Sequence, residues 1–142
     1  MSNNWGAVQF DDTEKVVPTI RLAHSLMRNE AWLYLFCPED WQIEAPIRYK
    51  VHENKRTIIP DVKYRDSDGI LNAVEIDRTQ MMNVNSEKMN KYGEFTLYYK
   101  NKYNGKVPIV HFFTITPYRQ KTLEQFAVQH GVYAKVYVVP EV

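Results

Sequence analysis

The chain has 142 residues, 44% of them hydrophobic and 25% charged, which is the composition of a globular domain and excludes a disordered tail. Its formal net charge of +1 argues against a dedicated non-specific DNA binder, which carries a strong basic excess, but is compatible with a local basic surface. No segment approaches the ~20 apolar residues of a membrane span and none resembles a signal peptide, so we expect a cytoplasmic protein without a membrane partner.

The N-terminal part predicts an arm followed by one helix. Residues 1–11 are polar and are expected to form a flexible arm, with a single domain over residues 12–142. Apolar residues at helical spacing predict a helix that begins at Asp12 or Thr13 and ends near Phe36, just before a proline.

Three strands are predicted next. Apolar and basic residues alternate over residues 47–51, which is the period of a half-buried strand. After a turn over residues 53–55, two more strands are predicted over residues 57–64 and 70–77, joined by an Asp-Ser-Asp-Gly hairpin turn. Pro60 marks an irregularity in the second strand, because proline is confined to strand edges, strand starts and bulges.

A second helix and a buried strand follow. The helix is expected to be capped by Asn83, Asn85 or Ser86 and to end near residues 101–105. Residues 107–116 are apolar and β-branched, which is typical of a strand covered on both faces.

The C-terminal part predicts a third helix and a last strand. Pro117 suits the first turn of a helix, and Gly131 suits the position just after its end. Residues 132–139 complete the order α-β-β-β-α-β-α-β. This order predicts an α/β fold, a single layered domain with a mixed central sheet and flanking helices.

Three carboxylates stand out on the second and third predicted strands. Glu75 and Asp77 share one face of their strand, and Asp61 can approach Glu75 across the hairpin. Converging carboxylates suit Mg²⁺ or Mn²⁺, which can activate water for phosphodiester cleavage. The alternative is structural: Glu75 or Asp77 could form a salt bridge with nearby basic residues, the candidates being Arg48, Lys63 and Arg78.

The arrangement resembles the core of the PD-(D/E)XK phosphodiesterases. In that superfamily a Pro-Asp on the second strand and a Glu on the third bind the metal, and Asp61 and Glu75 match them. A lysine two residues after the Glu activates or orients the water, and Asp77 occupies that position here. The resemblance therefore implies a restriction-endonuclease-like fold whose lysine is missing, and Lys91 on the following helix is the candidate replacement.

A closer resemblance is to the replication-relaxation family of plasmids and other mobile elements. The motifs that carry it are "LAHSLMRNEAWLYL" from Leu22, "IPDVKY" from Ile59, "AVEIDRTQ" from Ala73, a Lys-x-x-x-Tyr feature at Lys88, Lys91 and Tyr92, and an early helical Arg119. Many members carry an N-terminal winged-helix DNA-binding region, which we expect to be absent here or supplied by another chain. The resemblance implies DNA or plasmid and phage replication proteins as partners.

Basic residues with interleaved tyrosines suggest a nucleic-acid surface. One group lies on the first two predicted strands, and another follows near the end of the second helix: Arg48, Lys50, Lys55, Arg56, Lys63 and Arg65, then Lys100, Lys102 and Lys106 beside Tyr98, Tyr99 and Tyr103. Such residues can follow a phosphate backbone and stack on bases. The predicted nucleic-acid-binding residues are Arg48, Lys50, Lys63, Lys88 and Arg119. The alternative for the lysines, including Lys88 and Lys91, is a solvated helix or strand surface.

The sequence argues against two other common kinds of site, a zinc site and a phosphate-binding loop. The single cysteine, Cys37, is expected to be buried and reduced, and the four histidines show no zinc-site spacing with it. With five glycines in the chain, no phosphate-binding loop is present in the sequence.

Two functions therefore remain open, with a weaker third. The first is a non-catalytic, nuclease-fold accessory protein in plasmid or phage DNA replication, relaxation or transfer, with no certain cofactor. The second is a Mg²⁺- or Mn²⁺-dependent endonuclease or nickase that uses Asp61, Glu75 and Asp77, with Lys91 as the water-orienting group. The third is a homo-oligomerisation module that uses the tyrosine-rich surface.

Overall fold

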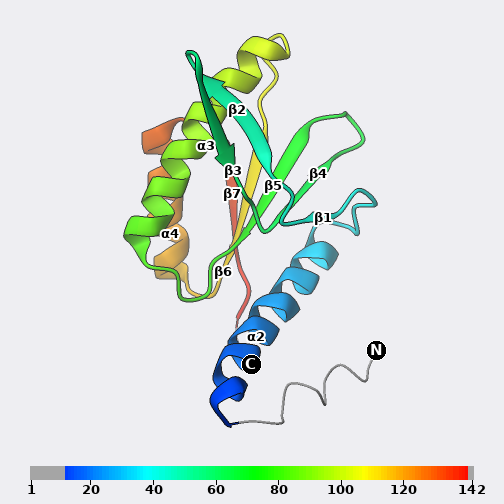
Figure 1. Cartoon of the computed structure of the whole chain (residues 1–142), viewed down its shortest axis with the longest axis vertical. Coiled ribbons are helices and arrows are strands. Elements are labelled where there is room, and N and C mark those ends of the chain that lie inside the picture. The colour runs from blue at the N-terminus through cyan, green and yellow to red at the C-terminus, as the bar shows by residue number, and fades with distance from the viewer. Residues whose placement is uncertain (1–11, 141–142) are drawn as a thin grey trace. The chain divides into compact units, whose positions relative to one another are not determined.

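The computed structural model describes residues 12–140, and for residues 12–18 the backbone alone. The chain divides into two compact units, one up to Phe36 and one from Cys37 onward. The first unit contains helix α2 (Asp12–Tyr34), which confirms the predicted N-terminal helix (Figure 1). The predicted flexible arm, residues 1–11, lies outside the described residues, and the single domain over residues 12–142 stays a prediction.

The second unit is built on a five-stranded mixed sheet. Its strands are β1 (Gln42–Ile43), β4 (Val62–Arg65), β5 (Leu71–Ile76), β6 (Ile109–Thr114) and β7 (Ala134–Val138), adjacent in that order. The β1–β4 and β4–β5 pairs are antiparallel, whereas β5–β6 and β6–β7 are parallel. Helices α3 (Met82–Lys102) and α4 (Pro117–His130) form the two crossovers (Figure 1). The predicted mixed sheet with flanking helices is confirmed.

The strand predicted over residues 57–64 is in fact two strands. The first, β3 (Asn54–Ile58), pairs with β2 (Ile47–Val51) as a separate antiparallel hairpin. The second, β4, belongs to the main sheet. The break falls at Pro60, where the backbone has no N–H to continue a ladder. The chain therefore leaves one sheet and enters another at the proline that marked the irregularity.

The two helices of this unit begin differently. Helix α4 starts with Pro117 and ends at Gly131, as predicted; Gly131 has the left-handed conformation, and the Thr116 hydroxyl caps the start of the helix. Helix α3 starts earlier than predicted: its N-cap is Met81, which has no side-chain capping bond. Asn85, one of the predicted caps, lies inside the helix and is buried.

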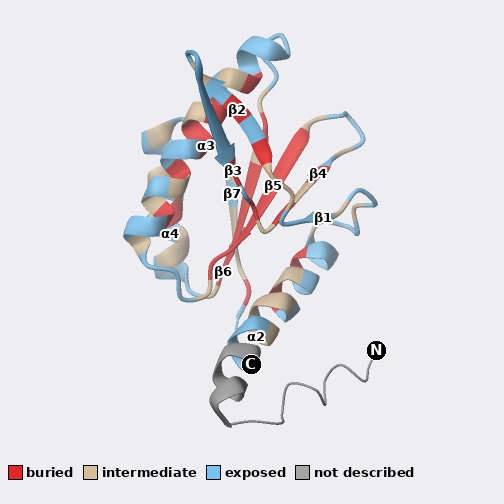
Figure 2. Cartoon of the chain, in the orientation of Figure 1, coloured by how far each residue is buried: buried red, intermediate tan, exposed pale blue. Residues whose placement is uncertain are grey.

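The core of the second unit lies between the main sheet, α3, α4 and the β2–β3 hairpin. It is formed by Tyr92 and Phe95 of α3 against Ala73 of β5 and Phe112 of β6. Buried residues run along the whole of β5, as Figure 2 shows. The expectation that Cys37 is buried is wrong: the thiol residue is exposed, in the connector before β1.

Candidate functional site

The acidic residues lie where β5 ends beneath α3. The antiparallel register pairs Val62 with Val74. Asp61 comes one residue before Val62, and Glu75 one residue after Val74, so the two acids lie across from each other. The Asp61 carboxylate accepts the backbone N–H of Ile76 at 2.7 Å. Asp61 is thus the residue just before β4, and its carboxylate lies against the end of β5 next to Glu75.

Glu75 is buried and held by two side chains of α3. The Lys88 ammonium donates to one carboxylate oxygen at 2.9 Å, and the Tyr92 hydroxyl donates a short hydrogen bond to the other. Burial raises the pKa of Glu75 to about 7; the charge on Lys88 and the hydrogen bond from Tyr92 oppose the rise, and the nearby Asp61 carboxylate adds to it. Glu75 therefore changes its charge near neutral pH, inside a protein core.

Replacing Glu75 with Gln should flatten the pH dependence of stability. Because the folded-state pKa of about 7 lies above the ordinary 4.5, Glu75 favours folding while protonated, and this contribution is lost as the pH rises from 4.5 to 7. The expected loss across that window is roughly 3 kcal/mol. Gln cannot ionise, yet it still accepts the Tyr92 hydrogen bond.

The measurement is urea unfolding of the wild type and Glu75→Gln from pH 4.5 to 8. Glu124→Gln, at an exposed position on α4, is the matched control and should follow the wild type. Parallel curves for the wild type and Glu75→Gln would show that Glu75 does not titrate in this range.

Asp77 forms a second, separate polar cluster. Arg119 of α4 donates to both carboxylate oxygens at 2.8 Å, in a bidentate pair. The Thr114 hydroxyl donates at 2.7 Å and the Asn85 side-chain amide at 3.1 Å. Burial alone would raise the pKa of Asp77, but the hydrogen bonds from Arg119, Thr114 and Asn85 outweigh it and hold the pKa below its ordinary value. Asp77 is therefore a buried carboxylate whose negative charge is balanced by Arg119.

The three carboxylates thus have different surroundings. Within the described residues, no group of three or more His, Cys, Asp or Glu side chains is placed to hold a metal ion. Both oxygens of Asp77 are engaged by protein donors, which does not suit a metal ligand. The Mg²⁺ or Mn²⁺ site on Asp61, Glu75 and Asp77 stays a prediction.

The ion pairs join β5 to the helices. The salt-bridge alternative predicted Arg48, Lys63 or Arg78 as the basic partner of Glu75 or Asp77. The observed ion pairs are Glu75–Lys88 and Asp77–Arg119. Their sequence separations are long, so spacing along the strands could not identify them. One signal was present: residues four apart share a helix face, and this puts Lys88 and Tyr92 of the Lys-x-x-x-Tyr feature together.

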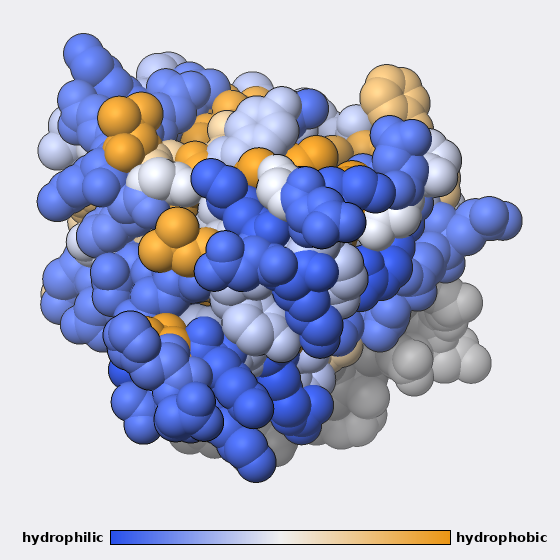
Figure 3. Space-filling model, turned by 90° about the horizontal axis from the view of Figure 1, so that it is seen from above, coloured by the Kyte–Doolittle hydropathy of each residue, from blue (hydrophilic) through white to orange (hydrophobic). Residues whose placement is uncertain are grey.

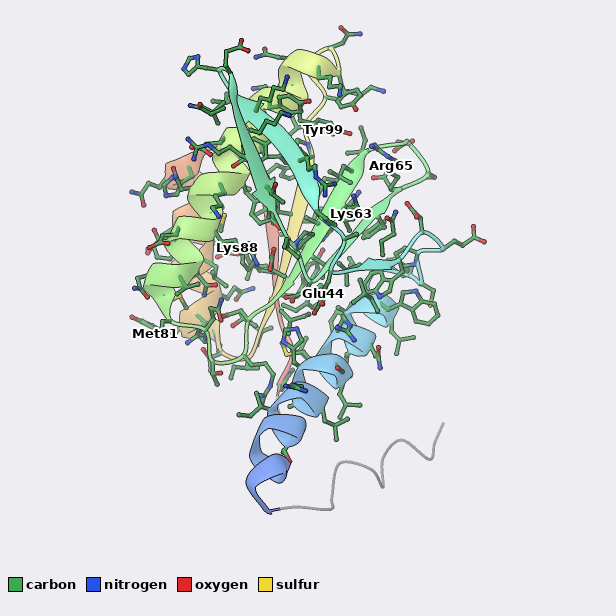
Figure 4. All side chains as sticks on the ribbon, in the orientation of Figure 1. Glu44, Lys63, Arg65, Met81, Lys88 and Tyr99 are labelled. Carbon is green, nitrogen blue, oxygen red and sulfur yellow. The ribbon has the colours of Figure 1, made fainter. Side chains whose placement is uncertain are left out.

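Of the two helix lysines, Lys88 reaches the acid. Its ammonium also lies 3.4 Å from the carbonyl oxygen of Ile59. Figure 4 shows Lys88 on α3. The alternative of a solvated surface lysine does not hold for Lys88, whose half-buried side chain pairs with Glu75. Lys91 is exposed, and with Lys88 and Val84 it lines a groove of about 330 Å³ beside this cluster. The predicted role of Lys91 as a replacement for the missing lysine is untested.

A second feature of this unit is a groove lined by basic residues, which we call the basic groove. It consists of two adjoining pockets that share Arg48 and Tyr98. The hairpin pocket, about 320 Å³, is lined by Arg48, Tyr49, Lys50, Lys55, Arg56, Thr57 and Tyr98. The tyrosine pocket, about 140 Å³, is lined by Pro46, Ile47, Arg48, Lys63, Arg65, Leu71, Phe95, Tyr98, Tyr99, Lys102 and Tyr103.

The basic groove gathers some of the predicted nucleic-acid-binding residues and separates others from them. Arg48, Lys50 and Lys63 line it, whereas Lys88 and Arg119 are engaged with Glu75 and Asp77. Figure 4 shows Lys63 and Arg65 on β4 near Tyr99 of α3. Seen from above, mainly hydrophilic residues cover this end of the molecule, with a few separate hydrophobic ones (Figure 3).

Comparison with known proteins identifies the family. The family model described as replication-relaxation matches residues 5–110, which is most of the chain and includes the Glu75 cluster and all residues that line the basic groove. No curated protein and no solved structure matches the chain. Among the described residues, no helix is long and apolar enough to cross a membrane. The match over residues 5–110 shows that the chain belongs to the replication-relaxation family.

Proposed function

We propose that the protein is a cytoplasmic accessory factor that binds DNA without cutting it. Its family suggests a role in the replication or relaxation of plasmids or other mobile elements. The observation that carries DNA binding is the basic groove: seven Lys and Arg residues line its two pockets, and no Asp or Glu of the described chain does, the seven being Arg48, Lys50, Lys55, Arg56, Lys63, Arg65 and Lys102. A surface of this kind attracts a phosphate backbone.

The acidic clusters support a non-catalytic protein. A catalytic ion needs carboxylates open to the metal and a group that orients water. Asp77 stands where a PD-(D/E)XK nuclease has its lysine, and Arg119 occupies both of its oxygens. Neutralisation by the protein itself makes Asp77 a structural residue that joins β5 to α4.

One observation favours the endonuclease as the second candidate. The Lys88 ammonium meets Glu75 at 2.9 Å, and Asp61, just before β4, accepts the backbone N–H of the next residue, Ile76. An acid–lysine grouping of this kind is what the PD-(D/E)XK resemblance would need, with Lys88 in place of Lys91. A metal ion would then have to displace the Lys88 ammonium from the carboxylate.

We expect salt-sensitive DNA binding and no cleavage. In a salt-titrated anisotropy assay on a labelled duplex, Arg48→Ala and Lys63→Ala should each weaken binding and lower the salt slope by about one. Lys121→Ala, which removes a charge from an exposed position on α4, is the matched control and should bind like the wild type. An effect of Lys121→Ala equal to that of the groove variants would contradict the assignment of the groove.

The same preparations test catalysis. The wild type should not nick supercoiled plasmid with Mg²⁺ or Mn²⁺, and Glu75→Gln should retain DNA binding. Nicking by the wild type that both Glu75→Gln and Lys88→Met abolish would establish the endonuclease in place of the accessory factor.

A further inference from the structure

The tyrosine pocket combines a basic rim with an apolar and aromatic floor. Its floor contains Leu71, Phe95 and Tyr99, all buried, and Tyr98 and Tyr103 form its walls. A site for phosphate alone needs cations and no such floor. Bases of a duplex are stacked inside the helix and meet a protein only at their edges, whereas an unpaired base presents a whole ring face to aromatic side chains.

The aromatic side chains of the pocket contact one another and neighbouring groups of the protein. The ring centroids of Tyr99 and Tyr103 lie 4.5 Å apart, and the Tyr99 hydroxyl accepts the backbone N–H of Leu71 at 3.1 Å. The Lys102 ammonium lies 5.6 Å from the Tyr98 ring centroid and 5.8 Å from that of Tyr103. The two rings therefore flank a cation at the mouth of the pocket, where a base and its phosphate would arrive together.

Lys63 and Arg65, two cations at the rim of the tyrosine pocket, are held by contacts that do not neutralise their charge. Lys63 donates to the carbonyl oxygen of Pro46 at 2.8 Å, and Arg65 donates to that of Gly69 at 3.1 Å. A carbonyl oxygen orients an ammonium or guanidinium without cancelling its charge. Two acids lie nearby: Asp66 accepts backbone N–H groups of Asp68 and Ile70 in the hairpin turn, and Asp40 accepts the backbone N–H of Arg65 at 3.2 Å and the side-chain amide of Gln42.

The hairpin pocket continues the basic groove beyond Tyr98. Arg48 and Lys50 are exposed on the same face of β2, two residues and therefore roughly 7 Å apart. Cations repeated at this spacing suit successive phosphates of an extended strand. Arg48 and Tyr98 line both pockets, so the two pockets adjoin at these residues.

From these features we infer that the basic groove selects single-stranded DNA, with an unpaired base in the tyrosine pocket and the following phosphates on the hairpin pocket. This inference rests on the proposed DNA-binding function and adds the form of DNA that is bound. A duplex can use the rim and the hairpin pocket, but it cannot fill the floor of the tyrosine pocket.

The test compares three ligands of the same length in an anisotropy assay at one salt concentration: a single strand, its duplex, and a strand of abasic nucleotides. The single strand should bind at least about tenfold more tightly than the other two, because stacking of one base contributes about that factor or more. Tyr98→Leu and Tyr103→Leu should each weaken binding of the single strand far more than binding of the duplex, and so remove most of this preference. Tyr98→Phe keeps the ring and should behave like the wild type.

Tyr118→Leu is the matched control, since this tyrosine lies on α4 and is 77% exposed. Equal affinity for the three ligands, or a preference that survives both leucine variants, would overturn single-strand selection while leaving DNA binding intact. Failure to bind any of the three at low salt would instead refute the proposed function. Should a leucine variant not fold, the abasic strand on the wild type decides the question alone.

Discussion

Arg119→Ala should lower the free energy of unfolding by about 3–5 kcal/mol, because removal of one partner leaves a buried charge without its counter-ion. Asp77 is 1% exposed, and its bidentate partner joins the end of β5 to the first turn of α4. The Arg119 guanidinium also donates to the backbone carbonyl of Gln80, so the change releases the chain between β5 and α3 as well. Urea unfolding at pH 7 measures the loss.

The deficit of Arg119→Ala should shrink in acid. In the wild type the pKa of Asp77 is below 3.8, so its contribution to stability is complete above pH 3.8 and is lost as the pH falls through the lower folded-state pKa. Without Arg119, burial dominates and raises the pKa of Asp77, so the variant regains stability as the carboxylate protonates below neutral pH. A deficit that stays constant from pH 7 to pH 4 would show that lost packing, rather than charge, causes the effect.

A second change separates the two causes at neutral pH. Asp77→Asn in the Arg119→Ala background should recover part of the lost stability, because an amide needs no counter-ion. Lys121→Ala, an exposed change on the same helix, should stay within about 0.5 kcal/mol of the wild type.

Phe112→Ala should be comparably destabilising, by about 3–5 kcal/mol, because it removes a large ring from a close-packed core. Phe112 is 0% exposed in the middle of β6, where it pairs with Glu75 of β5 on one side and Val136 of β7 on the other. The loss of the ring leaves a cavity beneath α3 that the strand, paired on both edges, cannot close. Urea unfolding monitored by circular dichroism measures the effect.

Two controls accompany Phe112→Ala. Phe112→Leu keeps most of the side-chain volume and should lose about 1 kcal/mol. Leu97→Ala, at a position of α3 that is 65% exposed, should change stability little. A loss below about 1 kcal/mol for Phe112→Ala itself would mean that β6 does not pack as the structure has it.

The elements of the second unit could be predicted where local chemistry decides them. Helix α4 is delimited by Pro117 and Gly131, whose backbone requirements are visible in the sequence. Strand β6 is buried along almost all of its length, as the apolar, β-branched sequence of residues 107–116 predicts. Helix α3 begins at Met82 without a side-chain cap, so a start predicted from capping residues falls too late.

The pairing of distant groups could not be predicted in the same way. Residues 57–64 resemble one strand interrupted by a proline, and this hides the passage from the β2–β3 hairpin to the main sheet, because a local sequence does not show which sheet a strand joins. Lys88 and Lys91 differ by less than one helical turn, and only packing decides which of them reaches Glu75. The Asp77–Arg119 pair depends on where α4 begins relative to β5, which no local pattern contains.

The two halves of the main sheet also differ in when they can form. The β4–β5 hairpin joins residues close in sequence, whereas β5–β6 and β6–β7 are parallel pairs that must wait for α3 and α4. During synthesis the apolar strand β6 emerges before its outer neighbour, so its edge stays open until residues 134–138 leave the ribosome. We expect the docking of β7 on β6 to set the pace at which this sheet forms and to end the interval in which the open edge of β6 can aggregate.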